Sequence, residues 1–490
     1  MKELEIVIQC AKVTLLVLFC VGLLLFIFQK KGLRAPGGLG FKNIRLKLVK
    51  SKRLYKIFDF ESLVRGMLVV GGAGAGKTNS IVFPLIQKVA EEQYTGLIYD
   101  FKFPTLASYY YDRWLSIGQP RVNPYYINYD DLTRSHRYNV LKIVPNSTYA
   151  QEYSASLIMN LLPESIKNPD FFLRTSGSLL SASIWYFQRN KKEFCTLPHI
   201  ISFLLNPDIK RIVEILSSDA ESADMVAPVR SGLASEKQTA AVISTIQNAL
   251  SFCANPKVFW VLSGNDFDLV LNDPENPKII ILGNKASLIS SISPLISLTI
   301  TAATKLMNER GRAKGIVLLE EGPTLFIPGL EILPATGREN KIATIYITQD
   351  ISQMDDRYGE KKSEVLISNL ANQLYGKISN PKTMEKVVKI FDKDEVLFES
   401  SSSNESKRSW NDGSSGRTHS FQQRERVTIS QLRDLNPGQF VATTVELKDF
   451  KAKFLPSPKN EFELPEITYV TDKMVEDNYK KIKQEVLTLF

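Results

Sequence analysis

A glycine-rich loop at residues 71–78 constrains this chain more than any other feature. It runs Gly-Gly-Ala-Gly-Ala-Gly-Lys-Thr and fits the pattern G-x-x-x-x-G-K-[ST] in full. The apolar run Met67–Val70 before it predicts a buried strand, and Ser80–Ile86 after it predicts the start of a helix. Small residues there let the backbone turn sharply and aim its N–H groups at a polyphosphate. We therefore expect a nucleotide site in an α/β domain; the alternative is a glycine-rich turn without a ligand.

The residue types in the loop predict which part of the nucleotide or metal each one contacts. Lys77 is expected to reach the β- and γ-phosphates, and the Thr78 hydroxyl is expected to hold Mg²⁺. The predicted cofactors are ATP and Mg²⁺. The predicted phosphate-binding residues are Gly71, Gly72, Ala73, Gly74, Ala75, Gly76, Lys77 and Thr78.

The N-terminus predicts a membrane anchor within residues 1–34. Val13–Phe28 is apolar and uncharged, and extension back to Ile6 makes the segment long enough to cross ~30 Å of hydrocarbon. Lys30 and Lys31 follow as a stop-transfer flank, whereas a cleaved signal peptide, the alternative, would end in small residues. Ten basic residues lie between positions 30 and 56 and two before the span, so the positive-inside rule places the bulk of the chain in the cytoplasm. The same basic stretch would touch anionic lipids of the membrane.

Composition limits the number of domains and the kinds of partner and metal site that this chain can have. The 490 residues have room for two or three domains, and the net charge of +9 gives mild support to a nucleic-acid partner. The cysteines and histidines show neither a disulfide framework nor zinc-type spacing. The cysteines are Cys10, Cys20, Cys195 and Cys253.

Hydrophobic periodicity divides the rest of the chain. Apolar strands alternate with helices on both sides of a stretch with helical spacing, which favours a mostly parallel sheet interrupted by an all-α insertion. The predicted parts are a membrane anchor (1–34), the first part of a nucleotide-binding domain (35–146), an all-α domain (147–268), the second part of the nucleotide-binding domain (269–455) and a C-terminal tail (456–490). Serine-rich residues 399–420 are expected to form a disordered loop.

An acidic pair supplies the expected second half of the site. Glu320 and Glu321 directly follow the apolar run Ile316–Leu319. The usual pair there is Asp-Glu, so Glu320 is one methylene longer than expected. We assign Glu320 to the metal and Glu321 to activation of water. The alternative is two solvated glutamates at a strand end.

Two further polar residues lie at element ends. Gln349 closes the predicted strand Ile342–Thr348 and is placed to contact the γ-phosphate or the attacking water. Arg338 precedes that strand and is expected to complete the site of a neighbouring subunit, as arginines do in ring-shaped motors. The alternative for Arg338 is an ordinary surface arginine.

The segment from Leu318 to Gly359 resembles the type IV coupling proteins, the TraG/TraD-like ATPases of bacterial conjugation and type IV secretion. The resemblance rests on a strand followed by an acidic pair, then Gly337-Arg338, then Gln349–Met354, then Tyr358-Gly359. Further segments agree with the family in their order along the chain. These are Asp100–Lys102, Arg137–Leu141, Asp170–Phe172 and Leu435–Gln439.

The resemblance implies a RecA-like P-loop NTPase that is anchored in the inner membrane of a bacterial cell, in contact with inner membrane lipids, and works as a homo-hexamer. Such proteins recruit a relaxase with single-stranded DNA, or protein substrates, and pass them to a type IV secretion channel by ATP hydrolysis. This chain departs from many members in having one predicted span and no extended acidic tail. Two other functions stay open: an ATP-binding receptor or scaffold with little turnover, and a related DNA translocase.

Overall fold

The computed structural model divides the chain into two units that we treat separately. The larger unit comprises Leu46–Asp392 and Val427–Phe490, and the smaller one includes Lys393–Arg426. The predicted membrane anchor, residues 1–34, lies outside the described part of the chain. The described residues are 47–49, 60–167, 171–403, 415–457 and 462–490.

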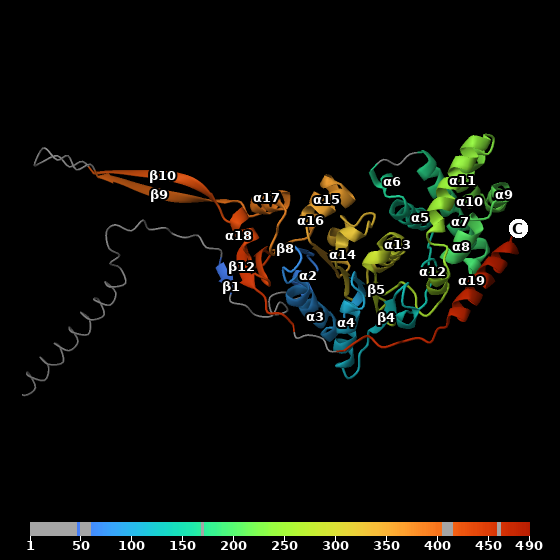
Figure 1. Cartoon of the computed structure of the whole chain (residues 1–490), viewed down its shortest axis with the longest axis horizontal. Coiled ribbons are helices and arrows are strands. Elements are labelled where there is room, and N and C mark those ends of the chain that lie inside the picture. Colours follow the sequence, from blue (N-terminus) through green and yellow to red (C-terminus); the bar gives the residue numbers. More distant parts are fainter. Residues whose placement is uncertain (1–46, 50–59, 168–170, 404–414, 458–461) are drawn as a thin grey trace, which may run out of the picture. The chain divides into compact units, whose positions relative to one another are not determined.

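The larger unit alternates strands and helices before and after a long helical stretch (Figure 1). Its strands are β1 (Lys47–Val49), β2 (Met67–Val70), β3 (Thr95–Asp100), β4 (Asn123–Ile127), β5 (Lys278–Gly283), β6 (Gly315–Leu319), β7 (Ile342–Thr348), β8 (Asn372–Tyr375), β11 (Gln439–Thr443) and β12 (Phe450–Lys453). Its α/β helices are α2 (Phe60–Leu63), α3 (Phe83–Glu91), α4 (Thr105–Leu115), α13 (Ile289–Met307), α14 (Leu333–Glu339), α15 (Ile351–Tyr358), α16 (Glu360–Asn369), α17 (Pro381–Ile390) and α18 (Ile429–Arg433). The helices between the two halves, and after them, are α5 (Ser147–Leu161), α6 (Glu164–Lys167), α7 (Phe171–Asn190), α8 (Leu197–Leu204), α9 (Ile209–Ser217), α10 (Ala220–Gly232), α11 (Glu236–Ser251), α12 (Pro256–Leu262) and the C-terminal α19 (Asp472–Leu487).

One sheet organises this unit, in the order β1-β12-β11-β8-β2-β7-β6-β3-β5-β4. The pairs from β8 to β4 are all parallel, and β11 pairs antiparallel with both of its neighbours. The mostly parallel sheet predicted from the apolar runs is therefore confirmed. Strand β7 lies between β2, which leads into the glycine-rich loop, and β6, which leads into the acidic pair. Because these strands are parallel, the residues that follow them emerge at one edge of the sheet.

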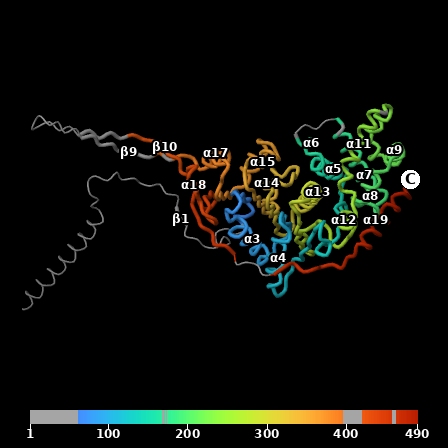
Figure 2. The backbone as a smooth tube through the Cα atoms, viewed as in Figure 1, coloured from blue at the N-terminus to red at the C-terminus, as the bar shows by residue number. Residues whose placement is uncertain are grey.

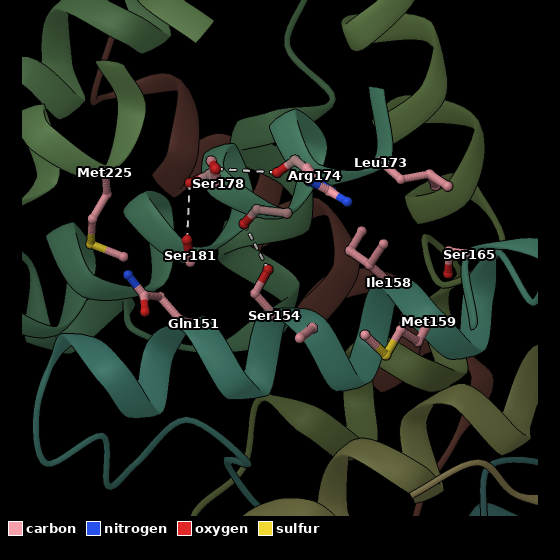
Figure 3. Close-up of a pocket in the computed structure, with 12 residues that line it drawn as sticks. Gln151, Ser154, Ile158, Met159, Ser165, Leu173, Arg174, Ser178, Ser181 and Met225 are labelled. Carbon is pink, nitrogen blue, oxygen red and sulfur yellow. Dashed lines mark hydrogen bonds between the residues drawn. The ribbon is translucent and has the colours of Figure 1, made fainter. Parts of the chain in front are cut away.

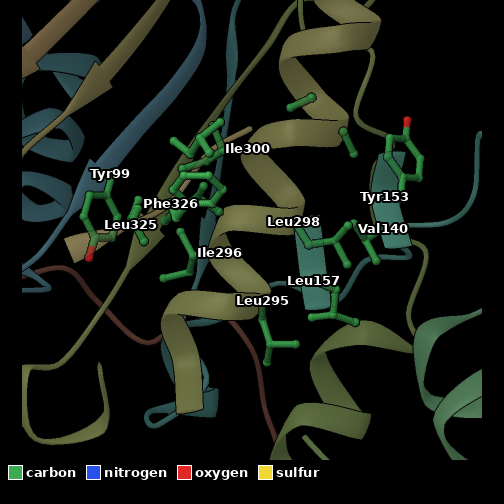
Figure 4. Close-up of a cluster of buried hydrophobic side chains, with 14 of the residues drawn as sticks. Tyr99, Val140, Tyr153, Leu157, Leu295, Ile296, Leu298, Ile300, Leu325 and Phe326 are labelled. Carbon is green, nitrogen blue, oxygen red and sulfur yellow. The ribbon is translucent and has the colours of Figure 1, made fainter. Parts of the chain in front are cut away.

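Apolar side chains bury both faces of the sheet. In β2, Met67 and Val69 belong to the cluster covered by α3 and α4, and Leu68 and Val70 belong to the cluster on the opposite face. Such complete burial explains why the strands have continuous apolar sequences without alternation. The helix α13 covers the second face, where Leu295 to Ile300 pack against sheet and helix residues (Figure 4).

Helix α13 is the one described helix long and apolar enough to cross a membrane. Two thirds of its most apolar 18-residue stretch is buried inside the molecule. Its burial against the sheet and α5 accounts for that composition, because a helix that is apolar all round belongs in a protein core or a bilayer.

The described residues between positions 147 and 268 form helices and short turns. Helix α19 packs against two of them, α8 and α12, although it follows α12 by some two hundred residues. Figure 2 shows this C-terminal segment, in red, beside the green helices. Val475, Ile482 and Val486 are its buried face. The predicted C-terminal tail therefore ends in a helix that is part of the packed structure.

The expected disordered loop at 399–420 is wrong for its described residues. Strands β9 (Lys393–Ser403) and β10 (Ser415–Glu425) pair antiparallel, with Leu397 opposite Phe421 and Glu399 opposite His419. Serine content suggested a segment unable to order, but the backbones of the two strands pair in register from Lys393 opposite Glu425 to Ser403 opposite Ser415. The tip, residues 404–414, lies outside the described residues.

Candidate nucleotide-binding site

The glycine-rich loop leaves β2 at the carboxyl edge of the sheet and is fixed at its start by neighbouring strands. The Gly71 N–H donates to the Thr348 carbonyl (3.2 Å), and the Gly72 N–H donates to the Lys377 carbonyl (2.7 Å). Gly74 and Gly76 have φ of +75° and +87°, in the left-handed region that favours glycine. A single π-helical turn, Thr78–Val82, then leads into α3. The predicted strand, loop and helix are thus all present.

The loop fits a phosphate group. Within the described residues, the N–H groups of Gly74, Gly76 and Lys77 find no protein acceptor. The Lys77 ammonium lies over the same loop and donates to the carbonyls of Gly71 and, at 3.3 Å, Gly72. Burial lowers the pKa of Lys77, and the nearby Glu321 and Glu320 oppose that shift. Free N–H groups next to a buried cation are what a polyphosphate needs.

The acidic pair meets the loop although the two are far apart in sequence. The Thr78 hydroxyl donates to Glu320 Oε1 at 3.1 Å. Glu320 Oε2 is buried and, among the described residues, has no hydrogen-bond partner. Burial raises the pKa of Glu320. A buried carboxylate oxygen without a partner beside a threonine hydroxyl is an oxygen donor set of the kind that Mg²⁺ prefers. The residues present therefore fit the predicted metal.

Glu321 and Gln349 form the second contact of the site. Gln349 Nε2 donates to Glu321 Oε1 at 2.9 Å. Glu321 has a φ of +54°, an uncommon conformation for a residue other than glycine. Thr324 fixes that turn, because its N–H and its hydroxyl both donate to the Glu321 carbonyl, at 3.0 and 2.7 Å. Backbone strain of this kind concentrates at functional sites.

Arg338 does not join the other predicted residues. It is exposed in the last turn of α14, just before the first residue of β7. Gln349, which does join them, directly follows the last residue of the same strand. A strand of that length separates its two ends by ~20 Å. Arg338 thus lies at the opposite edge of the sheet from the loop of its own chain.

Asp100 is a buried residue beside the site to which sequence reasoning gave no role. Its carboxylate accepts the N–H groups of Leu106 (2.8 Å), Ala107 (3.0 Å) and Lys102 (3.2 Å), and so caps the start of α4. Burial, and secondarily the charge of Glu320, raises the pKa of Asp100 to about 7. The available signal was an apolar strand that ends in an acid.

Gly438 is a second residue that the sequence left without a role. Its N–H donates to the Ala75 carbonyl at 2.9 Å, from behind the loop. A Cβ added at Gly76 would lie 2.6 Å from the Gly438 nitrogen, so the two backbones pack directly. The signal was the segment Leu435–Gln439, which was noted only as part of the family pattern.

A separate cavity lies in the helical part of the larger unit. It lies between α5 and α7 (Figure 3) and has a volume of about 290 Å³. Ile158, Met159, Leu173 and Met225 make much of its lining apolar, and Arg174 is its one charged lining residue. It therefore lacks the paired titratable groups that acid–base chemistry requires.

The geometry defines a class of protein. A strand, a phosphate-binding loop and a helix, with an acidic pair and a glutamine brought in by two neighbouring parallel strands, are the parts of a P-loop NTPase. Residues 42–444 match the family described as type IV secretory system conjugative DNA transfer. The chain belongs to that family, and its resemblance to the type IV coupling proteins is confirmed.

Solved structures of the conjugative coupling protein TrwB share the fold. An unbound form lacking the N-terminal segment has a TM-score of 0.63 at 16% identity, over 83% of this chain and 88% of that chain. A form with sulphate has a TM-score of 0.64 at 15% identity, over 87% and 98%. The complex of TrwB with ADP and Mg²⁺ has a TM-score of 0.63 at 16% identity, over 83% and 89%. No curated protein matches the sequence.

Proposed function

We propose that this member of the conjugative DNA transfer family is a membrane-anchored, RecA-like ATPase. It would couple a relaxase–DNA complex to a type IV secretion channel and drive transfer by hydrolysing ATP. The observation that carries the proposal is the 3.1 Å contact between Thr78 and Glu320, which joins the two halves of the nucleotide site. TrwB supports the choice of cofactor, because it has been solved with ADP and Mg²⁺ and with a non-hydrolysable ATP analogue.

In this proposal each residue of the site has one task. The loop N–H groups bind the phosphates, and Lys77 moves from the loop carbonyls to the β- and γ-phosphates. Thr78 and Glu320 hold Mg²⁺, which when bound neutralises charge on those phosphates. Glu321 orients the attacking water and accepts its proton, and Gln349 holds Glu321 in place through its 2.9 Å hydrogen bond.

Arg338 acts on the site of a neighbouring copy. The predicted homo-hexamer would place the edge of the sheet that carries Arg338 against the loop of the next subunit. There the guanidinium would stabilise charge on the phosphoryl group in transfer, as in-trans arginines do in other NTPases. Support comes from the exposed position of Arg338, which is too far from its own loop to serve it.

The test compares ATP hydrolysis by the purified full-length protein with and without single-stranded DNA. Wild type should hydrolyse ATP only with Mg²⁺ and faster with DNA. Glu321→Gln should lower kcat by at least about a hundredfold with nucleotide affinity nearly kept, because proton acceptance by a placed side chain contributes that much. Lys77→Ala should remain in the membrane fraction and abolish conjugative transfer. A wild type that binds ATP without DNA-stimulated turnover would favour the scaffold function instead.

A further inference from the structure

A polar hollow opens at the N-terminal edge of β6 and β7. Its volume is about 390 Å³. Two segments form it, one before the first residue of β6 and one before the first residue of β7. The residues that line it are Arg310, Gly311, Arg312, Glu339, Asn340 and Lys341.

Hydrogen bonds hold the two segments together. Asn340 Nδ2 donates to Asn308 Oδ1 at 2.7 Å, and Asn308 Nδ2 donates to Thr336 Oγ1 at 3.0 Å. The Gly315 N–H donates to the Lys341 carbonyl at 2.9 Å. Lys341 has a φ of +59°, so a side chain is kept at a position where glycine would be less strained. These hydrogen bonds therefore fix the two segments that form the hollow.

Positive charge without a partner gathers around this hollow. Arg310 and Lys341 are exposed, as is the nearby Arg338, and none of the three pairs with an acid among the described residues. Arg312 differs, because its guanidinium pairs with Glu309 at 2.6 Å. One carboxylate, that of Glu339, also lines the hollow. The net field favours a small, multiply charged anion.

Size and lining favour compact phosphates over a nucleic-acid strand. The volume falls in the range of small-molecule sites. Single-stranded nucleic acid is normally held by aromatic side chains on which its bases stack, and none of the six lining residues is aromatic. A nucleotide's phosphate chain matches the charge and needs no stacking surface.

A nucleotide whose phosphates enter this hollow cannot be the one bound by the loop of the same chain. The loop begins next to Thr348, the last residue of β7, and the hollow lies next to Ile342, the first. The length of the strand keeps the two ~20 Å apart. A nucleotide bound by the loop can therefore reach the hollow only in an assembly, from the loop of a second molecule.

We propose that Arg310 and Lys341 contact the phosphate groups of the nucleotide held by a second copy of this chain. The proposal rests on the function proposed above, which brings Arg338 to the same place. It adds two positively charged contacts, from Arg310 and Lys341, and a hollow that receives the phosphates. The nucleotide site is then incomplete in a single chain.

The first test uses the full-length protein with one positive charge removed at a time. Arg310→Ala and Lys341→Asn should each lower kcat for ATP hydrolysis by about tenfold, the usual effect of one charge-assisted hydrogen bond. Asparagine is chosen at Lys341 because it tolerates the left-handed conformation. Lys361→Ala, which removes an exposed charge from α16, is the matched control and should hydrolyse ATP like wild type. Nucleotide affinity measured on the dilute, unassembled protein should not change.

The second test mixes two inactive variants. Arg310→Ala/Lys341→Asn keeps an intact loop, and Lys77→Ala keeps an intact hollow. Random assembly would give about a quarter of the interfaces one intact loop facing one intact hollow, so the mixture should regain activity that neither variant has alone. Rescue is the result that in-trans action requires.

Three outcomes would overturn the proposal while leaving the proposed ATPase intact. Hollow variants could hydrolyse ATP as fast as wild type, or mixing could give no rescue. The third outcome is that the hollow variants keep DNA-free ATP hydrolysis but bind DNA more weakly. The salt dependence of DNA binding would then fall by about one counterion for each charge removed, and the hollow would be a nucleic-acid site. A wild type without ATPase activity would instead refute the proposed function.

Discussion

At the scale of single residues, three side chains and a glycine set the geometry of Glu321. Gly322 follows it, and a Cβ added there would lie 2.4 Å from the ring of Tyr346. Tyr346 is fully buried in β7, so its ring cannot move aside. Thr324 holds the Glu321 carbonyl, and the Tyr99 hydroxyl lies 2.9 Å from Thr324 Oγ1. The position of the proposed water-activating residue thus depends on neighbours outside the glycine-rich loop.

Gly322→Ala should therefore impair catalysis more than nucleotide binding. The methyl group pushes the turn away from Tyr346 and displaces Glu321 from Gln349, so kcat should fall by about tenfold or more while nucleotide affinity stays within about threefold. Steady-state kinetics and equilibrium binding of a nucleotide analogue measure the two effects.

A double-mutant cycle identifies the cause. Tyr346→Leu makes room, so Gly322→Ala should cost less in that background, with a coupling of about 0.5–3 kcal/mol. Gly118→Ala, where a Cβ would meet open space, is the control and should be neutral. An equal loss from Gly322→Ala in both backgrounds would show that Tyr346 is not the obstacle.

Sequence reasoning reached most of this site because its residues lie at strand ends. The loop, Glu320, Glu321 and Gln349 each follow an apolar run, and parallel strands deliver their ends to one edge. Asp100 also follows such a run, but nothing in the sequence tells that its carboxylate turns inward to cap α4. Gly438 could not be predicted for a different reason: its contact with the loop depends on where the sheet places the start of β11, more than 350 residues later in the chain.

At the scale of elements, α19 and α8 show how a terminal segment becomes part of the fold. His199 of α8 is buried, and its Nε2 lies 3.1 Å from Glu485 Oε2 of α19. Its Nδ1 lies 2.6 Å from the Thr196 hydroxyl. Burial lowers the pKa of His199 from its usual 6.5, and the Glu485 carboxylate opposes this shift. Lys481, one turn earlier on α19, also faces Glu485 and works against a charged imidazole.

The docking of α19 should weaken in mild acid. The unfolded chain protonates His199 as the pH falls through 6.5, whereas the folded chain keeps the imidazole neutral to a lower pH. The unfolded state then binds more protons than the folded state. The free energy of unfolding therefore decreases as the pH decreases below the usual pKa of histidine. His199→Gln removes the titrating group. As the pH falls from about 7.5 to 5.5, wild type should therefore lose stability relative to the variant.

Chemical denaturation at several pH values, followed by fluorescence, measures that shift. Glu485→Gln serves as the second variant, since without its carboxylate the pKa of His199 should fall further and the acid sensitivity should begin at the same pH but extend lower. Parallel stability curves for wild type and His199→Gln across this range would contradict the prediction.

At the scale of the whole molecule, family membership and fold agree on one nucleotide-binding unit. The chain matches the conjugative DNA transfer family over residues 42–444. The proposed anchor precedes that region, and the helical stretch interrupts the nucleotide-binding sequence without interrupting the sheet, because β5 returns to pair between β3 and β4. An insertion between two strands is tolerated when its ends meet the sheet at neighbouring positions.

Deletion of residues 1–34 should release the protein from the membrane. The apolar span is the predicted attachment, so the truncated chain should move to the soluble fraction after cell lysis and lose conjugative transfer. Lys77→Ala provides the control, since it should lose transfer while staying in the membrane fraction. A truncated chain that still sediments with membranes would show that another surface provides the attachment.

Short-range sequence pattern is enough to predict the nucleotide loop and the run of buried strands. The loop must be small to turn, and strands covered on both faces must be apolar. Which of these residues lie next to one another depends on how the strands are ordered in the sheet. Glu320 is one methylene longer than the usual acid and still meets Thr78, because β7 spaces their strands. Arg338 and Gln349 are near in sequence but at opposite edges of the sheet, because a strand runs between them.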